Sequence, residues 1–243
     1  MNGDNNPDPN APLQYDHAAA GADWAKLINE MRDEMTANGW DMQVNIQGGS
    51  DIETGQTDTT ANPPRIGFEP PTLTKLWLSG FGSARSLNVF MYDYGDAGGC
   101  PENTHTGTER CNVQYYMPTD TRWTQDDVWV AAAGTGFSVA FPEIYARPNA
   151  GDRNNIYPGV ISANASQWEE IALYSYYVQN TRMFFVAPLS QYYICHASGT
   201  LSPECVNNDN TPRQAYDSLY IALHYDPETA QTPPFASDLR ATN

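Results

Sequence analysis

Residues 41–53, DMQVNIQGGSDIE, contain the pattern that decides the fold. Polar and apolar residues alternate from Asp41 to Ile46, which is typical of a strand with one buried face. The run Gln47-Gly48-Gly49 predicts a glycine-rich loop, and two acids, Asp51 and Glu53, follow it. A helical pattern precedes the segment, so we expect a helix, then a strand, then a loop that carries carboxylates.

Helical and strand patterns continue to alternate along the chain. Apolar spacing predicts four helices, which cover residues 23–38, a segment from about 72, residues 163–179 and a segment from 212 onward. The last of these follows a capping box formed by Thr211 and Gln214. Expected extended segments cover residues 41–46, 87–92, 128–133, 139–144 and 183–189.

This order predicts an α/β fold, because strands that alternate with helices pair in parallel through right-handed crossovers. We expect a mostly parallel, TIM-barrel-like sheet in a single domain over residues 23–243, after a polar lead-in at residues 1–22. The predicted strands are fewer than the eight of a complete barrel, and the first element is a helix. The sheet is therefore expected to be open, or a barrel incomplete at its N-terminus.

The net charge of the chain limits the classes of partner that it can bind. The 243 residues carry a formal net charge of −17 at pH 7. Such a surface repels nucleic acid and anionic membranes, so we expect neither as a partner. No apolar run in the sequence reaches the length that spans a bilayer. A neutral or cationic ligand suits this charge, and solubility alone would also account for it.

The four cysteines form two local pairs. Cys100 and Cys111 flank one polar loop, and Cys195 and Cys205 flank another. This spacing predicts two disulfides, each worth roughly 2–3 kcal/mol in the entropic account. A zinc site is the alternative, since histidines lie in both loops, but the sequence has no C-x-x-C pair. Disulfides persist in oxidising compartments, so we expect a secreted protein.

Acidic residues follow three of the predicted strands. Asp51 and Glu53 follow the first, Asp93 and Asp96 the second, and Glu143 lies in a later extended segment. The segment after 183–189 carries Gln191 and Tyr192 instead. Since the carboxyl ends of parallel strands meet at one edge of a sheet, these side chains are expected to meet there. Chance placement and turn capping are the alternatives for each acid taken singly.

Paired carboxylates at a strand end suit glycoside hydrolysis, which needs one protonated and one ionised carboxyl group. We predict Glu53 as the acid/base and Glu143 as the nucleophile or base, supported by Asp51 and Asp93. The predicted substrate-binding residues are Trp77, Tyr92, Tyr94, Asp96, Tyr145, Gln191 and Tyr192. No cofactor or metal is predicted. The run Asn207–Asn210 offers oxygen ligands for calcium but lacks the spacing of a known loop, so an Asx-rich turn is the alternative.

Three short motifs carry a family resemblance. GGSDIE at 48–53, YDYGDAGGC at 92–100 and PEIY at 142–145 resemble segments of secreted bacterial glycoside-hydrolase-like (β/α)-barrel proteins. The D-x-E arrangement is also similar to that of lysozyme-like and chitinase-like barrels. The resemblance implies an extracellular hydrolase that acts on a poly- or oligosaccharide. A non-catalytic carbohydrate-binding or cell-surface module, or a secreted structural protein, remains the alternative.

Overall fold

The computed structural model describes residues 16–54, 71–111, 123–148, 161–197 and 205–239. It also describes residues 199 and 201 and the backbone of residues 57–58 and 65–66. Most of the predicted lead-in lies outside these ranges. Helix α1 (His17–Ala37) begins earlier than the predicted start at Asp23, because the Asp16 carboxylate caps it by accepting a hydrogen bond from the Ala19 N–H (3.0 Å).

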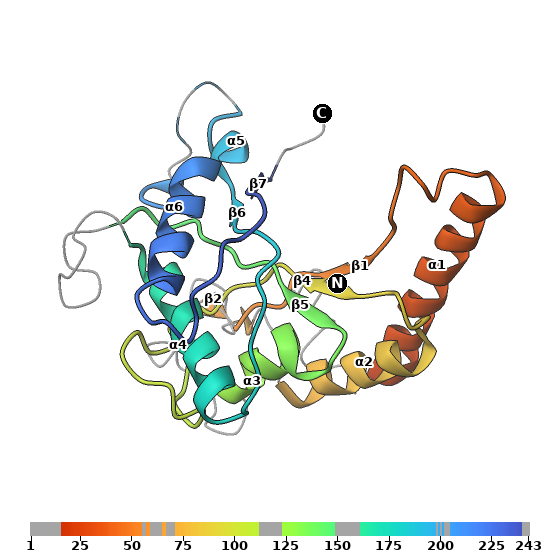
Figure 1. Cartoon of the computed structure of the whole chain (residues 1–243), viewed down its shortest axis with the longest axis horizontal. Helices are drawn as coiled ribbons and strands as arrows, with labels where there is room; N and C mark the ends of the chain where they lie inside the picture. Colours follow the sequence, from red (N-terminus) through yellow and green to blue (C-terminus); the bar gives the residue numbers. More distant parts are fainter. Residues whose placement is uncertain are drawn as a thin grey trace.

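Parallel strands form the centre of the molecule (Figure 1). Strands β1 (Gly48–Ser50), β4 (Met91–Asp93) and β5 (Ser138–Ala140) pair in the order β1-β4-β5. A parallel bridge from Ala140 to Phe185 attaches the segment 185–189 to β5, and a second, from Glu143 to Leu189, attaches it to the residues just after β5. That segment leads into β6 (Leu189–Ser190), which pairs in parallel with β7 (Ser237–Asp238). Strands β2 (Thr57–Asp58) and β3 (Arg65–Ile66) form a separate antiparallel pair.

Strand β1 is made of the glycines that were expected to form a loop. A Cβ atom on Gly48 would lie 2.8 Å from the Phe81 ring, and one on Gly49 would lie 2.8 Å from the Tyr94 ring. Glycine therefore makes room for two aromatic rings where the strand pairs with β4. The predicted strand at 41–46 is wrong, since these residues lie outside regular strands and Met42 is 90% exposed.

Residues 128–133 are helical, although they were expected to form a strand. Helix α3 (Gln125–Trp129) continues into one π-helical turn, η1 (Val130–Gly134). A capping box starts α3: the Thr124 N–H donates to the Asp127 carboxylate (2.9 Å), and the Asp127 N–H donates to the Thr124 hydroxyl (3.2 Å). This cap and the packing of Val128 in the core prevail over the β-propensity of the run Val-Trp-Val.

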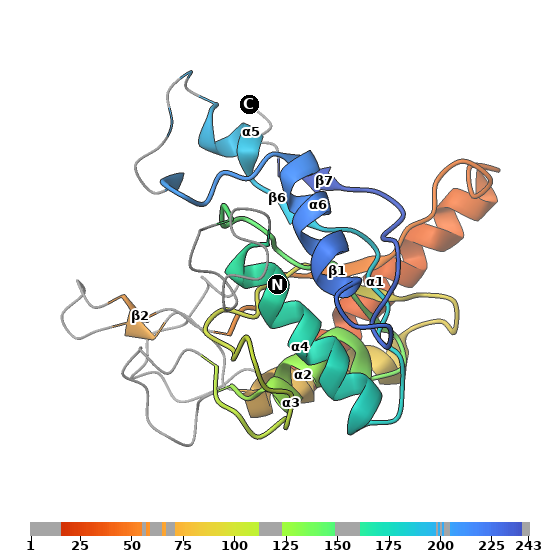
Figure 2. The same ribbon diagram turned by 60° about the vertical axis from the view of Figure 1, so that its left-hand side comes forward.

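The three longer helices that remain contribute residues to one hydrophobic core. Helices α2 (Pro71–Ala84), α4 (Ala163–Tyr177) and α6 (Pro212–Leu223) agree in position with three predicted helices, and a short α5 (Tyr192–Cys195) was not predicted. Helix α6 starts with the predicted capping box. Helices α4 and α6 lie side by side in two views (Figures 1 and 2).

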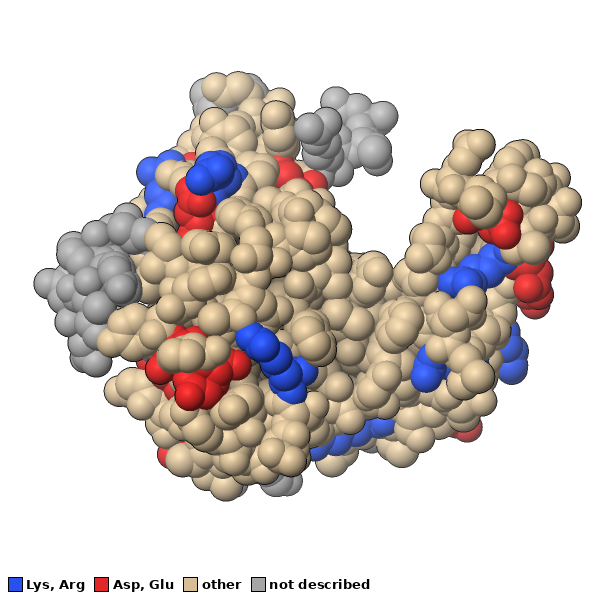
Figure 3. All heavy atoms as spheres, in the orientation of Figure 1, with Lys and Arg blue, Asp and Glu red and all other residues tan. Residues whose placement is uncertain are grey.

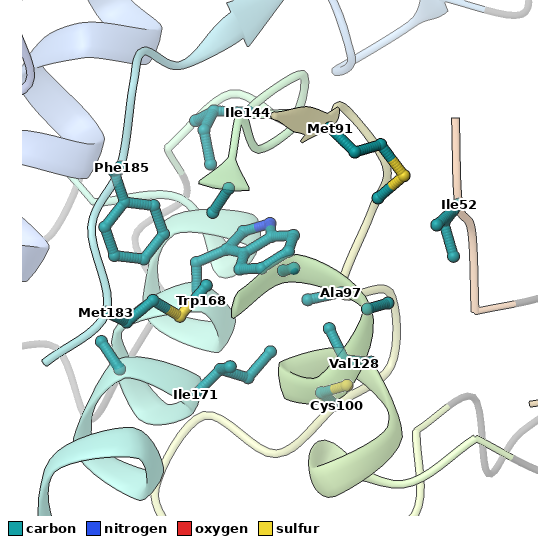
Figure 4. Packing of buried hydrophobic residues seen from close by; sticks show 14 of the residues in the cluster. Ile52, Met91, Ala97, Cys100, Val128, Ile144, Trp168, Ile171, Met183 and Phe185 are labelled. Carbon is teal, nitrogen blue, oxygen red and sulfur yellow. The ribbon is translucent and has the colours of Figure 1, made fainter. Parts of the chain in front are cut away.

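The core lies between the helices and the sheet (Figure 4). Trp168 and Ile171 of α4 have no exposed surface and belong to the same buried cluster as Met91 of β4. The indole of Trp168 contacts the Phe185 ring edge-to-face, with 6.1 Å between the ring centroids. This burial of large apolar side chains is the main force that holds α4 on the sheet.

The α/β prediction is confirmed, and the paired strands of β1-β4-β5 and β6-β7 are parallel. The described strands form small sheets and no closed barrel, so the barrel prediction is not confirmed. Both predicted disulfides, Cys100–Cys111 and Cys195–Cys205, are present. Among the described helices, none is both long and apolar enough to cross a bilayer.

Candidate active site

Three extended segments share one pattern of burial. Buried and half-buried residues alternate along 48–54, 91–97 and 138–142, and Tyr145 is again half-buried. Successive side chains on a strand point to opposite faces of the sheet, so one face packs on the helices and the other is partly open. We call the second face the open face. Its residues are Gly49, Asp51, Glu53, Tyr92, Tyr94, Asp96, Val139, Phe141, Glu143 and Tyr145.

Backbone pairing continues beyond the regular strands and brings the acids together. The N–H of Tyr94 donates to the Ser50 carbonyl (3.0 Å), and the N–H of Glu143 donates to the Gly95 carbonyl (3.1 Å). A Cβ atom on Gly95 would lie 1.7 Å from the Ile52 carbonyl oxygen. Only glycine at position 95 therefore lets the segment after β4 approach the segment that carries Asp51 and Glu53.

Asp51, Glu53 and Glu143 meet at this edge of the sheet. Each contributes one carboxylate oxygen to a group whose members all lie within 4.8 Å of one another. Asp51 and Glu53 are half-buried, whereas Glu143 is only 7% exposed. The cluster therefore combines two carboxylates near solvent with one that is withdrawn from it.

Glu143 holds its proton more strongly than an ordinary carboxyl group does. Burial raises the pKa of Glu143 to about 9, and the negative charges of Asp51, Asp96 and Glu53 act in the same direction. The hydrogen bond that the Tyr145 hydroxyl donates to Glu143 Oε1 (2.5 Å) opposes this rise. Burial also raises the pKa of Tyr145, so its hydroxyl remains a donor. At neutral pH Glu143 carries a proton.

Asp96 connects two of the three segments. Its Oδ1 accepts hydrogen bonds from the Thr54 N–H (2.9 Å) and the Thr54 hydroxyl (3.0 Å). The Thr54 hydroxyl also lies 2.9 Å from the Gly98 carbonyl oxygen, close to the Cys100–Cys111 disulfide. Asp96 thereby fixes the end of the segment that carries Asp51 and Glu53. Burial raises the pKa of Asp96 as well.

Asp93 lies on the opposite face. It is 1% exposed, and its Oδ1 accepts a hydrogen bond from the Gly95 N–H (3.2 Å). Burial raises the pKa of Asp93 well above its ordinary value, and the charges of Asp51 and Asp96 add to this effect. Asp93 was predicted as a supporting acid, but its position places it under the sheet, where it holds backbone N–H groups rather than a ligand.

The Asx-rich run holds the segment that carries Tyr145. The Asn210 amide donates to the Ile144 carbonyl (3.1 Å) and to the Ala146 carbonyl, and the Asn210 N–H donates to the Tyr145 carbonyl (3.1 Å). Asp209, whose side chain is fully buried, pairs with Arg147. The loop behind the Cys195–Cys205 disulfide therefore positions Tyr145 and, through its hydroxyl, Glu143.

The other predicted binding residues are dispersed. Tyr94 lies over Gly49 on the open face, and Tyr92 is half-buried beside it. Trp77 is 5% exposed and stacks on Phe81 in the core, so it packs α2 and is not available to a ligand. The Gln191 amide donates to the Asn208 carbonyl (2.8 Å), and the Tyr192 ring packs on the His196 ring.

Sequence reasoning missed several residues of this edge. Phe141 alternates with Val139 and Glu143 on one strand, a signal that the period of two could have revealed. Thr54 and Phe235 had no comparable signal, because their contacts come from segments distant in sequence. Asn210 lies in the run that was expected to form an Asx-rich turn, but its contacts with residues 144–146 were not predicted. The three clustered carboxylates could also hold a hard cation, which favours oxygen ligands. Such a cation would require Glu143 to ionise, which its burial opposes.

Comparisons with protein-family models, with curated proteins and with solved structures find no match to this chain, so the function is inferred from the site alone.

Proposed function

We propose that this protein is a glycoside hydrolase whose active site is the cluster of Asp51, Glu53 and Glu143. The observation that carries the proposal is the pairing of one buried, protonated carboxyl with two half-buried carboxylates whose oxygens lie within 4.8 Å. Glycosidic cleavage requires such a pair, since one group donates a proton while the other stabilises the positive charge that develops on the sugar.

The roles of the two glutamates are the reverse of those expected from the sequence. Glu143, with its raised pKa, is the proton donor to the glycosidic oxygen. Glu53 or Asp51 is the carboxylate that attacks the anomeric carbon as the bond to the leaving group breaks. The short separation favours the retaining pathway, in which the carboxyl groups are about 5–5.5 Å apart.

The second step returns the enzyme to its starting state. Once the attacking carboxylate is esterified to the sugar, its negative charge is lost, and the pKa of Glu143 falls. Glu143, now ionised, takes a proton from a water molecule as that water attacks the anomeric carbon. The ester bond breaks, the attacking carboxylate is regenerated, and Glu143 is protonated again.

The setting of the site agrees with this proposal. Tyr92 and Tyr94 share the open face with the carboxylates and offer aromatic surface to sugar rings. Two disulfides are typical of a protein from an oxidising compartment, so we propose an extracellular location. The net charge of −17 makes nucleic acid an unsuitable partner.

Carbohydrate binding without cleavage is a second candidate. It is favoured by the burial of Glu143, which exposes only 7% of its surface and so limits contact with a glycosidic oxygen. In that case the carboxylates would accept hydrogen bonds from sugar hydroxyls, and the tyrosines would stack on sugar rings. No proton would be transferred.

One experiment separates these candidates. Purified protein is incubated with a panel of polysaccharides, and new reducing ends are measured together with binding. The variants are Glu143→Gln, Glu53→Gln and Asp51→Asn, with Glu30→Gln on the exposed surface of α1 as the matched control. We expect release by the wild type and by the control, and a loss with Glu143→Gln. Binding without release by the wild type would favour the second candidate.

A further inference from the structure

Phenyl rings continue the open face away from the carboxylates. Phe141 belongs to this face and lies two residues before Glu143, about 7 Å along an extended strand. The Phe235 ring meets the Phe141 ring edge-to-face, with 6.4 Å between their centroids, although Phe235 comes from the segment before β7. Phe235 remains 50% exposed.

Phe184 extends the same aromatic surface. Its neighbours Met183 and Phe185 are buried in the core, so the Phe184 side chain points to the other side and is 66% exposed. The bridge between Ala140 and Phe185 places Phe184 beside Val139 of the open face. We call Phe141, Phe184 and Phe235 the phenyl surface.

This surface is unusual for its position in the fold. Parallel sheets are normally covered on both faces, and exposed apolar surface on a sheet usually marks a binding site. In the space-filling view a hollow lies between α1 and the part of the molecule that carries α5 and β7 (Figures 1 and 3).

The charges on the open face define the ligand. Its described residues include four carboxylic acids and no Lys or Arg, so a glycan with uronate or sulfate groups would be repelled. A sugar with apolar C–H faces can stack on an aromatic ring, and each further sugar can reach a further ring. The surface thus suits a chain of uncharged sugars better than a single sugar.

We propose that the phenyl surface is a binding subsite for an uncharged glycan chain, which runs from the carboxylate cluster across Phe141 to Phe235. This inference rests on the proposed glycoside hydrolase function and names its substrate class. The subsite holds sugars at a distance from the scissile bond, so its contribution grows with the length of the chain.

The dependence of cleavage on the length of the glycan chain provides the test. Wild type, Phe235→Ala, Phe235→Tyr and Leu87→Ala are assayed on uncharged gluco-, xylo-, manno- and N-acetylchito-oligosaccharides of two to six units, with polygalacturonate as the anionic comparison. Leu87 is 91% exposed on the turn before β4 and serves as the matched control. Circular dichroism and thermal unfolding check that each variant is folded, and size-exclusion chromatography with light scattering records its oligomeric state.

We expect Phe235→Ala to raise KM for the six-unit substrate about fivefold to tenfold, and to leave KM for the shortest cleaved substrate unchanged. Phe235→Tyr keeps the ring and should recover most of the affinity for the six-unit substrate that Phe235→Ala loses. Leu87→Ala, outside the proposed subsite, should behave as the wild type. An equal effect on short and long substrates, a preference for polygalacturonate, or a dimer that Phe235→Ala disrupts would overturn the subsite. Those results would leave the proposed hydrolase function intact. If the wild type cleaves none of the glycans, the proposed function itself is wrong.

Discussion

Asp93 and Glu143 are two buried acids, one at the end of β4 and the other just after β5, and they point to opposite faces of the sheet. Burial raises the pKa of each. Their partners differ: Asp93 accepts hydrogen bonds from the backbone N–H groups of Gly95 and Ile52, whereas Glu143 faces the Tyr145 hydroxyl and two further carboxylates. Burial and a raised pKa therefore do not identify a catalytic acid; the groups that face the acid do.

The largest expected effect is a difference in kcat between variants of the two acids. Glu143→Gln removes the proton donor, and we expect kcat to fall about a thousandfold on the best glycan of the panel. Asp93→Asn keeps an acceptor for the Gly95 N–H and should reduce kcat less than tenfold. Rate measurements on both variants check this, and equal losses would mean that the contrast between the two faces is wrong.

The second prediction concerns stability against pH. Glu143 has a folded pKa of about 9, above its ordinary value of 4.5, so above pH 4.5 the folded protein holds a proton that the unfolded chain releases. The contribution of protonated Glu143 to the free energy of unfolding is fully present below pH 4.5. It is lost as the pH rises toward 9. Denaturant titrations from pH 5 to 9 should show the wild type losing up to a few kcal/mol more than Glu143→Gln. Parallel curves would show that Glu143 is ionised in the folded state.

The third prediction is that Asp93 contributes to the stability of the fold and not to catalysis. Asp93→Ala leaves the Gly95 N–H without its buried acceptor and should lower the free energy of unfolding by about 1–3 kcal/mol. Asp93→Asn should lower it less, because the amide oxygen still accepts. Urea unfolding of the two variants provides the measurement. A larger loss with Asn than with Ala would argue against the role of Asp93 as a backbone acceptor.

The smallest effect is expected at Tyr145. Tyr145→Phe removes the hydrogen bond that lowers the pKa of Glu143, so the alkaline limb of the kcat profile should move to higher pH. We expect kcat at pH 7 to fall about tenfold, since Glu143 loses the group that orients it. The pH profile distinguishes this role from a simple loss of packing, which would lower kcat without moving the limb.

Some of the site could be predicted from the sequence. Glycine and acids after an alternating segment placed Asp51 and Glu53 at a strand end, and the same argument placed Asp96 and Glu143 near them. Asp93 was misassigned because a position near a strand end does not say to which face of the sheet the side chain points. Trp77 was misassigned because an aromatic residue on an amphipathic helix is equally suited to a core.

Local signals also explain which elements were found. The capping box at Thr211 fixed the start of α6, since its hydrogen bonds join residues three apart in sequence. The run at 128–133 was assigned to the wrong element because apolar β-branched residues suit a buried helix as well as a strand. Strand β1 was misplaced because the space that Gly48 and Gly49 leave is filled by Phe81 and Tyr94, which are distant in the chain.

The sequence by itself determined the alternating α/β order, the two disulfides and the acidic strand ends, because each depends on spacing between residues that are close in the chain. Only the tertiary structure decided that the sheet stays open, that Asp93 lies under it, and that Asn210 holds the segment of Tyr145. These features depend on the burial and pairing of groups far apart in sequence, and burial is also what gives Glu143 the proton on which the proposed chemistry depends.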